Sequence, residues 1–189
     1  MSGALDRWQA LGIRQITFQI KVHVNSDGGM RTTGANILGL ERSRYLHAIM
    51  LLDFEGSGAS TTEPLELENE LDQRLITDWG DSAKSIVIVP ELEAWVWGSD
   101  NALHRIVGRI SEQESLRQWL QNQGFDFNTQ KKPLRPKEAF EKILEKLRKQ
   151  RSSSWYKDIA TSISMKSCTD PAFIRLRHQL QQWFPKNEN

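Results

Sequence analysis

The chain contains the stretch Tyr45-Leu46-His47-Ala48-Ile49-Met50-Leu51-Leu52-Asp53-Phe54-Glu55-Gly56-Ser57-Gly58, an apolar run that is closed by acids and glycines. Short apolar runs with little polar alternation are typical of strands that are buried on both faces in a parallel sheet. We therefore predict such a strand over residues 45–52. In open α/β sheets, ligands bind just beyond the carboxyl ends of the strands, which makes Asp53 and Glu55 the first candidate site residues.

Asp53 and Glu55 are separated by one residue, so in an extended chain their side chains point the same way. Two neighbouring carboxylates repel each other, and a bound divalent cation is one way to relieve that repulsion. Mg²⁺ takes hard oxygen ligands, usually only a few carboxylates, with substrate phosphates completing its shell. The pair therefore predicts a site for Mg²⁺ or Mn²⁺.

A second short apolar run, residues 85–89, is followed by Pro90-Glu91-Leu92-Glu93. In one interpretation Pro90 is the first residue of a helix or lies just before one, and both glutamates lie in the first turn, where the helix dipole favours anions. In the other, one of these glutamates lies beside Asp53 and Glu55 and is a third metal ligand. The spacing alone does not favour either interpretation.

The rest of the chain predicts an α/β fold with a small, mostly parallel sheet flanked by helices and with a helical C-terminal half. Strict alternation over residues 16–24 indicates a half-buried strand that is closed by a turn at residues 25–29. Leucines at every fourth position predict a helix over 64–79, and strand–helix–strand order implies a parallel crossover. Further helices are expected at 111–124, from 136, around 155–163 and from 171. We expect a core over residues 1–130 and a basic helical extension over 131–189, packed on that core.

Composition excludes several classes of protein. The single cysteine, Cys168, rules out an internal disulfide framework and a cysteine-rich zinc site. No apolar run approaches the 18 residues or so that a membrane span needs, and no secretory signal is evident at the start. A cytoplasmic location is therefore expected.

The net charge of +1 conceals a strong polarity along the chain. Residues 53–100 carry a local net charge of −10, and residues 131–189 carry +8. An acidic site beside a basic surface suits a metal-dependent enzyme that acts on a polyanion. The alternative is that the basic residues only solvate helix faces. The candidate contacts to nucleic acid are Lys131, Lys132, Arg135 and Lys137.

Four segments together resemble a known bacterial family. They are Asp53-Phe54-Glu55-Gly56, Pro90-Glu91-Leu92-Glu93-Ala94-Trp95, Arg135-Pro136-Lys137-Glu138-Ala139, and the predicted helix after Cys168. Over residues 12–184 or so, the chain is similar to uncharacterised Toprim-like proteins. These are distantly similar to the Toprim domains of overcoming-lysogenization-defect nucleases and of phage-defence effectors encoded beside ABC-type ATPases.

The resemblance implies a Toprim-like core, Mg²⁺ held by acidic residues, and phosphodiester chemistry on nucleic acid. Asp53 and Glu55 match the paired acids of the family's central motif. Glu93 matches its later acid, with Glu91 as the neighbour, and Lys137 matches a basic position at a helix start. The catalytic residues implied in this way are Asp53, Glu55 and Glu93.

The chain departs from the Toprim pattern near its start. Toprim domains normally begin with a strand that ends in a glutamate, which acts as general acid or base. Here the predicted first strand ends in His23-Val24-Asn25-Ser26, so the opening strand–helix unit looks missing. Two hypotheses stay open: a nuclease subunit of an antiviral defence system, or a catalytically silent scaffold. Either one would work with a partner, such as an ABC-type ATPase or a second copy of the chain.

Overall fold

The computed structural model describes residues 2–98, 103, 114–150, 152, 161, 165 and 168–186. The chain divides into two compact units. The sheet unit comprises residues 17–91 and 171–185, and the helical unit comprises residues 1–16, 92–170 and 186–189. The predicted boundary at residue 130 falls inside the helical unit.

The sheet unit contains two parallel strands, β1 (Ala48–Asp53) and β2 (Ala83–Ile88), joined through helix α4 (Pro64–Trp79) and the short 3-10 helix η1 (Gly80–Ser82). The register pairs Ala48 with Ala83 and Asp53 with Ile88. The predicted adjacency and parallel direction of the two strands are therefore confirmed. Because the strands are parallel and in this register, their carboxyl ends lie side by side.

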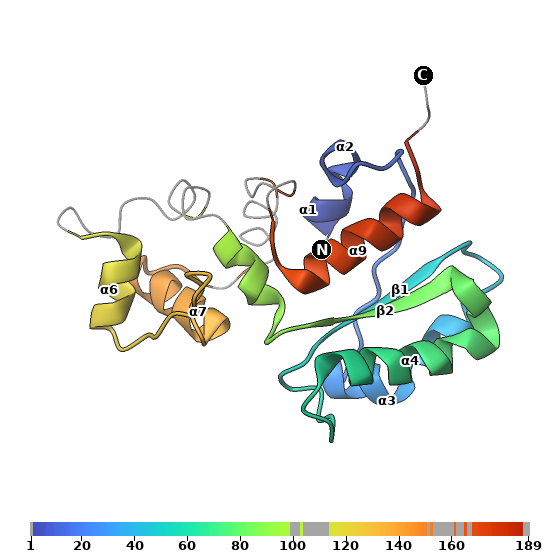
Figure 1. The fold of residues 1–189 in the computed structure, drawn as a ribbon, viewed down its shortest axis with the longest axis horizontal. Helices are drawn as coiled ribbons and strands as arrows, with labels where there is room; N and C mark the ends of the chain where they lie inside the picture. The colour runs from blue at the N-terminus through green and yellow to red at the C-terminus, as the bar shows by residue number, and fades with distance from the viewer. Residues whose placement is uncertain are drawn as a thin grey trace. The chain divides into compact units, whose positions relative to one another are not determined.

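Helix α4 forms where the leucine repeat predicts it. Leu67, Leu71 and Leu75 lie on one face and are buried in a single apolar cluster with β-strand residues such as Met50 and Val87. Pro64 is a suitable first helical residue, since it has no N–H to leave unpaired. Figure 1 shows α4 and α3 (Ser26–Gly39) on one side of the strands, with α9 (Pro171–Trp183) on the other. The predicted small sheet flanked by helices is confirmed.

Burial in the strands is less complete than the apolar run 45–52 predicts. Residues of β1 alternate between buried and half-buried, whereas β2 is buried at every position except Lys84. The two faces of β1 are therefore not equally covered. In the described residues the sheet has only two strands, so an apolar run does not require neighbours on both edges.

The predicted strand over residues 16–24 is wrong. Residues 14–23 take no regular structure, and the side chains of Val22 and Val24 are 86% and 92% exposed. The segment is held by side chains instead: Lys21 forms an ion pair with Glu41, and the Tyr45 hydroxyl donates to Gln19. Alternating apolar and polar residues suit a pleated strand. Such a segment becomes a strand only where it can hydrogen-bond to the edge of another strand.

Helix α3 replaces the turn predicted at residues 25–29 and continues to Gly39. It begins at Ser26, and Asp27 lies in its first turn, where the helix dipole favours an anion. Gly34 faces the side chains of Met30 and Met50 closely enough that a Cβ there would clash with them. The small residue therefore allows α3 to approach β1.

The helical unit contains α1 (Ser2–Leu5), α2 (Trp8–Leu11), the 3-10 helix η2 (Leu92–Gly98), α6 (Leu116–Asn122) and α7 (Pro136–Lys146). Its core joins η2, α6 and α7 through buried side chains that include Trp97, Leu120, Phe140 and Ile143. The capping box at the start of α6 is made by Ser115 and Gln118. The start of the helix predicted over 111–124, and most of the helix predicted near 155–163, lie outside the described residues.

The predicted helices from residues 136 and 171 are confirmed as α7 and α9. In α9 the buried face carries Phe173, Leu176 and Leu180, which are the predicted apolar positions. Among the described residues, none of the helices has both the length and the apolar character needed to cross a bilayer.

Candidate metal centre

The carboxyl ends of β1 and β2 stay hydrogen-bonded beyond the strands themselves. The Phe54 N–H donates to the carbonyl of Ile88 at 2.8 Å, and the Glu55 N–H donates to the carbonyl of Pro90 at 2.9 Å. Asp53 is the last residue of β1. The backbone of residues 88–90 is therefore held alongside residues 53–55, and the residue that follows it is Glu91.

Three carboxylates meet at this edge of the sheet. One carboxylate oxygen from each of Asp53, Glu91 and Glu93 lies within 4.8 Å of the other two. Glu91 and Glu93 are buried, and Asp53 is half-buried. The predicted proximity of Asp53 and Glu93 is confirmed. Oxygens on opposite sides of one Mg²⁺ ion are about 4.2 Å apart, so three oxygens within 4.8 Å of one another are close to the spacing that one divalent ion requires.

The chemistry of the donor set also fits a cation. Three like charges that are close together and shielded from water repel each other strongly, because burial removes the solvent that screens them. Carboxylate oxygens are the hard ligands that Mg²⁺ and Mn²⁺ take. This buried acidic triad can therefore hold a metal ion.

Each of the two interpretations of Glu91 and Glu93 is correct in part. Glu93 lies in the first turn of η2, as a helix start predicts, and it also belongs to the acidic triad. Pro90 does not open the helix, because η2 begins at Leu92. Glu91, which precedes the helix, joins the triad as well.

Glu55 lies outside the triad, and its side chain is exposed. Its predicted alignment with Asp53 assumed an extended chain. The strand ends at Asp53, and the chain then turns, with Ser57 N–H donating to the Phe54 carbonyl at 3.3 Å and Gly56 at a φ of 86°. The alternation of side-chain direction therefore ends at Asp53 and does not extend to Glu55.

Asp27 is a neighbour of the triad that the sequence does not reveal. Its Oδ1 accepts the backbone N–H of Asp53 at 3.0 Å, so the first turn of α3 holds the end of β1. The same end of the helix contacts the loop after β1, because Arg31 Nε donates to the Ser57 carbonyl at 2.8 Å. Only the tertiary fold brings these segments together, since they are 26 residues apart.

The predicted contacts to nucleic acid have different environments. Lys132 is buried, and its ammonium group binds Asp170 Oδ2 at 2.9 Å. Asp170 Oδ1 also accepts the indole N–H of Trp95 at 3.0 Å. Lys131, Arg135 and Lys137 are exposed, and Arg135 pairs with Glu138 at 2.6 Å. Lys132 is therefore buried and paired inside the helical unit, whereas the other three residues lie on its surface.

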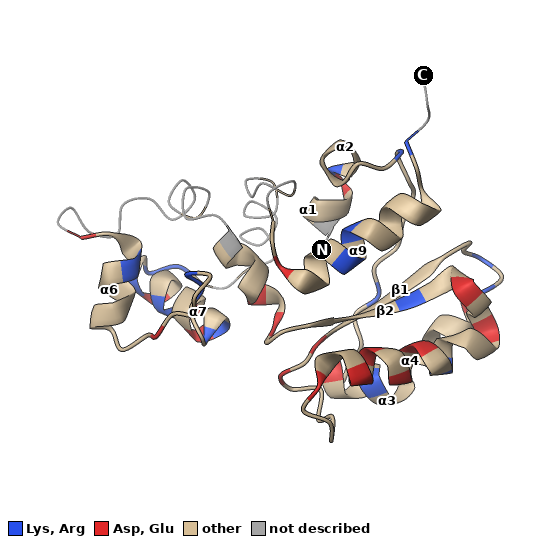
Figure 2. Ribbon diagram, viewed as in Figure 1, with Lys and Arg blue, Asp and Glu red and all other residues tan. Residues whose placement is uncertain are grey.

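Charge is not distributed evenly over the elements (Figure 2). Helix α4 carries many acidic side chains, whereas α9 carries Arg175 and Arg177 without any acid. Helix α7 has three lysines and three glutamates, so it is neutral as a whole. The excess of positive charge in residues 131–189 therefore does not come from α7.

Comparisons of the chain with protein-family models, with curated proteins and with solved structures find no match. The resemblance to Toprim-like proteins therefore stays a prediction, which rests on the sequence segments that carry it.

Proposed function

We propose that this chain is a Toprim-like subunit that uses Mg²⁺ or Mn²⁺ to act on phosphodiester bonds of nucleic acid. The observation that supports the proposal is the convergence of Asp53, Glu91 and Glu93 at the carboxyl edge of a parallel sheet. Ligand sites of open α/β sheets lie at that edge. The role in antiviral defence, with an ABC-type ATPase as partner, follows from the resemblance alone.

In this proposal the residues have separate roles. Asp53, Glu91 and Glu93 bind the ion, and Asp27 fixes the backbone of Asp53. When bound, the ion would neutralise charge on a phosphate and favour ionisation of a bound water. Glu55 stays a prediction as a catalytic residue, on the exposed loop that follows Asp53.

The exposed basic residues at the start of α7 stay the proposed contacts to nucleic acid. The side chains of Lys131, Arg135 and Lys137 are exposed, as contacts to phosphates require. Arg135 would have to exchange its ion pair with Glu138 for a phosphate. Lys132 is unsuited to that role while its ammonium is bound to Asp170.

A second candidate function is that of a scaffold that binds a partner protein, and exposed apolar side chains favour it. Val22, Val24, Leu40 and Leu46 are all more than 70% exposed. They lie on two segments that are linked by the Lys21–Glu41 ion pair. Exposed apolar side chains that form a contiguous patch often mark a site of protein association, and the ion pair brings the two segments that carry these residues together.

A cleavage assay tests the proposed enzyme. The full chain would be incubated with Mg²⁺ or Mn²⁺ and labelled single-stranded DNA, double-stranded DNA or RNA, alone and with the products of its neighbouring genes. We expect metal-dependent cleavage in the presence of the partner, and a loss of at least about a hundredfold in Asp53→Asn, as for other groups that stabilise charge in a transition state.

Asp78→Asn is the matched control, because Asp78 is exposed and lies near the end of α4, which leads to the amino end of β2. This variant should cleave like the wild type. Cleavage that persists unchanged in Asp53→Asn would contradict the proposed enzyme. Robust cleavage by the isolated monomer would contradict the need for a partner.

A further inference from the structure

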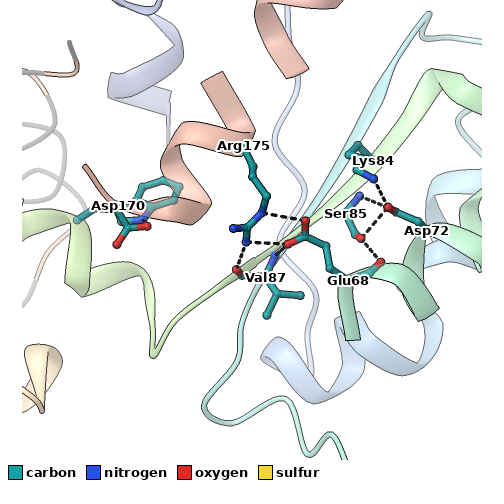
Figure 3. Close-up of polar contacts among 8 residues, drawn as sticks. Glu68, Asp72, Lys84, Ser85, Val87, Asp170 and Arg175 are labelled. Atoms are coloured by element: carbon teal, nitrogen blue, oxygen red, sulfur yellow. Dashed lines mark hydrogen bonds and ion pairs between the residues drawn. The ribbon is translucent and has the colours of Figure 1, made fainter. Parts of the chain in front are cut away.

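The outer edge of β2 is closed by side chains in place of a strand (Figure 3). The Ser85 N–H donates to Asp72 Oδ1 at 2.7 Å, and the Val87 N–H donates to Glu68 Oε2 at 3.0 Å. Both carboxylates come from α4. An unpaired sheet edge normally presents such groups to water or to another chain. Here the carboxylates of one helix take the place of the neighbouring strand.

An arginine of α9 completes this arrangement. Arg175 Nε donates to Glu68 Oε1 and its Nη2 donates to Glu68 Oε2, both at 2.9 Å, while Nη2 also reaches the carbonyl of Val87 at 3.2 Å. The N–H and the C=O of Val87 are therefore both bound by one ion pair. The Glu68 side chain is only 5% exposed, so the pair is anchored inside the sheet unit.

The Glu68–Arg175 ion pair binds the part of β2 that leads to the metal centre. Val87 precedes Ile88, whose carbonyl accepts the N–H of Phe54. Pro90, whose carbonyl accepts the N–H of Glu55, directly precedes Glu91. The carboxyl end of β2 is thus held from both sides, by β1 on its inner edge and by Glu68 and Arg175 on its outer edge.

We propose that Glu68 and Arg175 are positioning residues for the metal centre. They fix the carboxyl end of β2 through the peptide groups of Val87, and in this way they keep Glu91 opposite Asp53. The inference rests on the proposed metal-binding function. Groups that orient metal ligands without touching the ion commonly change metal affinity 10–100-fold when they are removed.

A role in positioning differs from a role in stability alone. Replacing a buried ion pair by apolar side chains of similar volume is often neutral for stability, whereas removing one partner is not. The double variant Glu68→Met with Arg175→Met should therefore stay folded, but it removes every hydrogen bond from the pair to Val87. Metal affinity in this variant reports positioning separately from folding.

The test uses the full chain as wild type, as the double variant, and as the control variant Lys142→Gln with Glu145→Gln. The control removes an exposed ion pair of α7 whose atoms lie 2.8 Å apart. Calorimetric titration with Mn²⁺ should show binding at least about tenfold weaker in the double variant and unchanged in the control. In the metal-free proteins, amide exchange at Phe54 should be faster in the double variant only, because the carbonyl of Ile88 is no longer held.

An unchanged Mn²⁺ affinity in the folded double variant would overturn the inference. A wild-type chain that binds no Mn²⁺ would overturn the proposed function instead. In that case the exchange of Phe54 still decides whether the pair holds this end of β2: unchanged exchange overturns that role, and faster exchange supports it.

Discussion

Asp53→Asn is expected to remove most of the rise in melting temperature that Mg²⁺ or Mn²⁺ produces in the wild type. Asn keeps the size of the side chain but removes one of the three charges within 4.8 Å of each other. A ligand that binds only the folded state stabilises it by about 2.7 kcal/mol at a concentration of 100 Kd. Most of that increment should disappear, and calorimetry with and without saturating Mn²⁺ would measure it.

The metal-free forms give the complementary result. Asn keeps the size of the Asp53 side chain, so Asp53→Asn without metal should still fold cooperatively, and its melting temperature is the reference for its metal response. Glu55→Gln is the matched control, because Glu55 lies two residues away and outside the triad. This control should keep the wild-type metal response. Equal metal responses in Asp53→Asn and the wild type would count against the triad.

Arg175→Met alone is expected to lower the free energy of unfolding by about 3 kcal/mol. The substitution leaves the carboxylate of Glu68, 5% exposed, without its bidentate cation. We expect the lower end of the range for broken buried pairs, because the Arg175 side chain is 30% exposed and its charge is partly solvated. Urea denaturation of the wild type and the variant would measure the difference.

The double variant Glu68→Met with Arg175→Met should recover part of this loss, since no uncompensated charge remains. The recovery is incomplete because the buried N–H of Val87 loses its acceptor. Two results would disagree with this account of the pair. One is a single variant that is as stable as the wild type. The other is a double variant that is less stable than the single variant.

The sequence predicts those parts of the sheet unit that depend on local periodicity. The repeat of Leu67, Leu71 and Leu75 is a helical pattern by itself, and the apolar runs on either side of it are short enough to be strands. Their order along the chain then implies parallel pairing. These features need no knowledge of distant contacts.

Helix α3 and the segment before it could not be predicted in the same way. Four glycines, including Gly34, and the lack of an apolar stripe hide the helix in the sequence. The alternation over residues 16–24 is a true strand pattern, but in the described residues β1 pairs only with β2. Whether such a segment becomes a strand depends on a free edge elsewhere in the fold.

The residues of the candidate site also differ in whether local sequence patterns predict them. Asp53 and Glu91 were predictable because each follows an apolar run at the end of a strand. Glu55 shows the limit of that reasoning, since the position of its side chain depends on the turn at Gly56. The pairing of Glu68 with Arg175 spans 107 residues, a separation at which no local pattern indicates contact.

The central claim is that Asp53, Glu91 and Glu93 hold one divalent ion. Anomalous diffraction from crystals of the chain grown or soaked with Mn²⁺ tests it most directly. The account predicts an anomalous peak at bonding distance from carboxylate oxygens of this triad, with no such peak in crystals of Asp53→Asn. Mn²⁺ bound only elsewhere, or a peak at the triad that is unchanged in Asp53→Asn, would contradict the account.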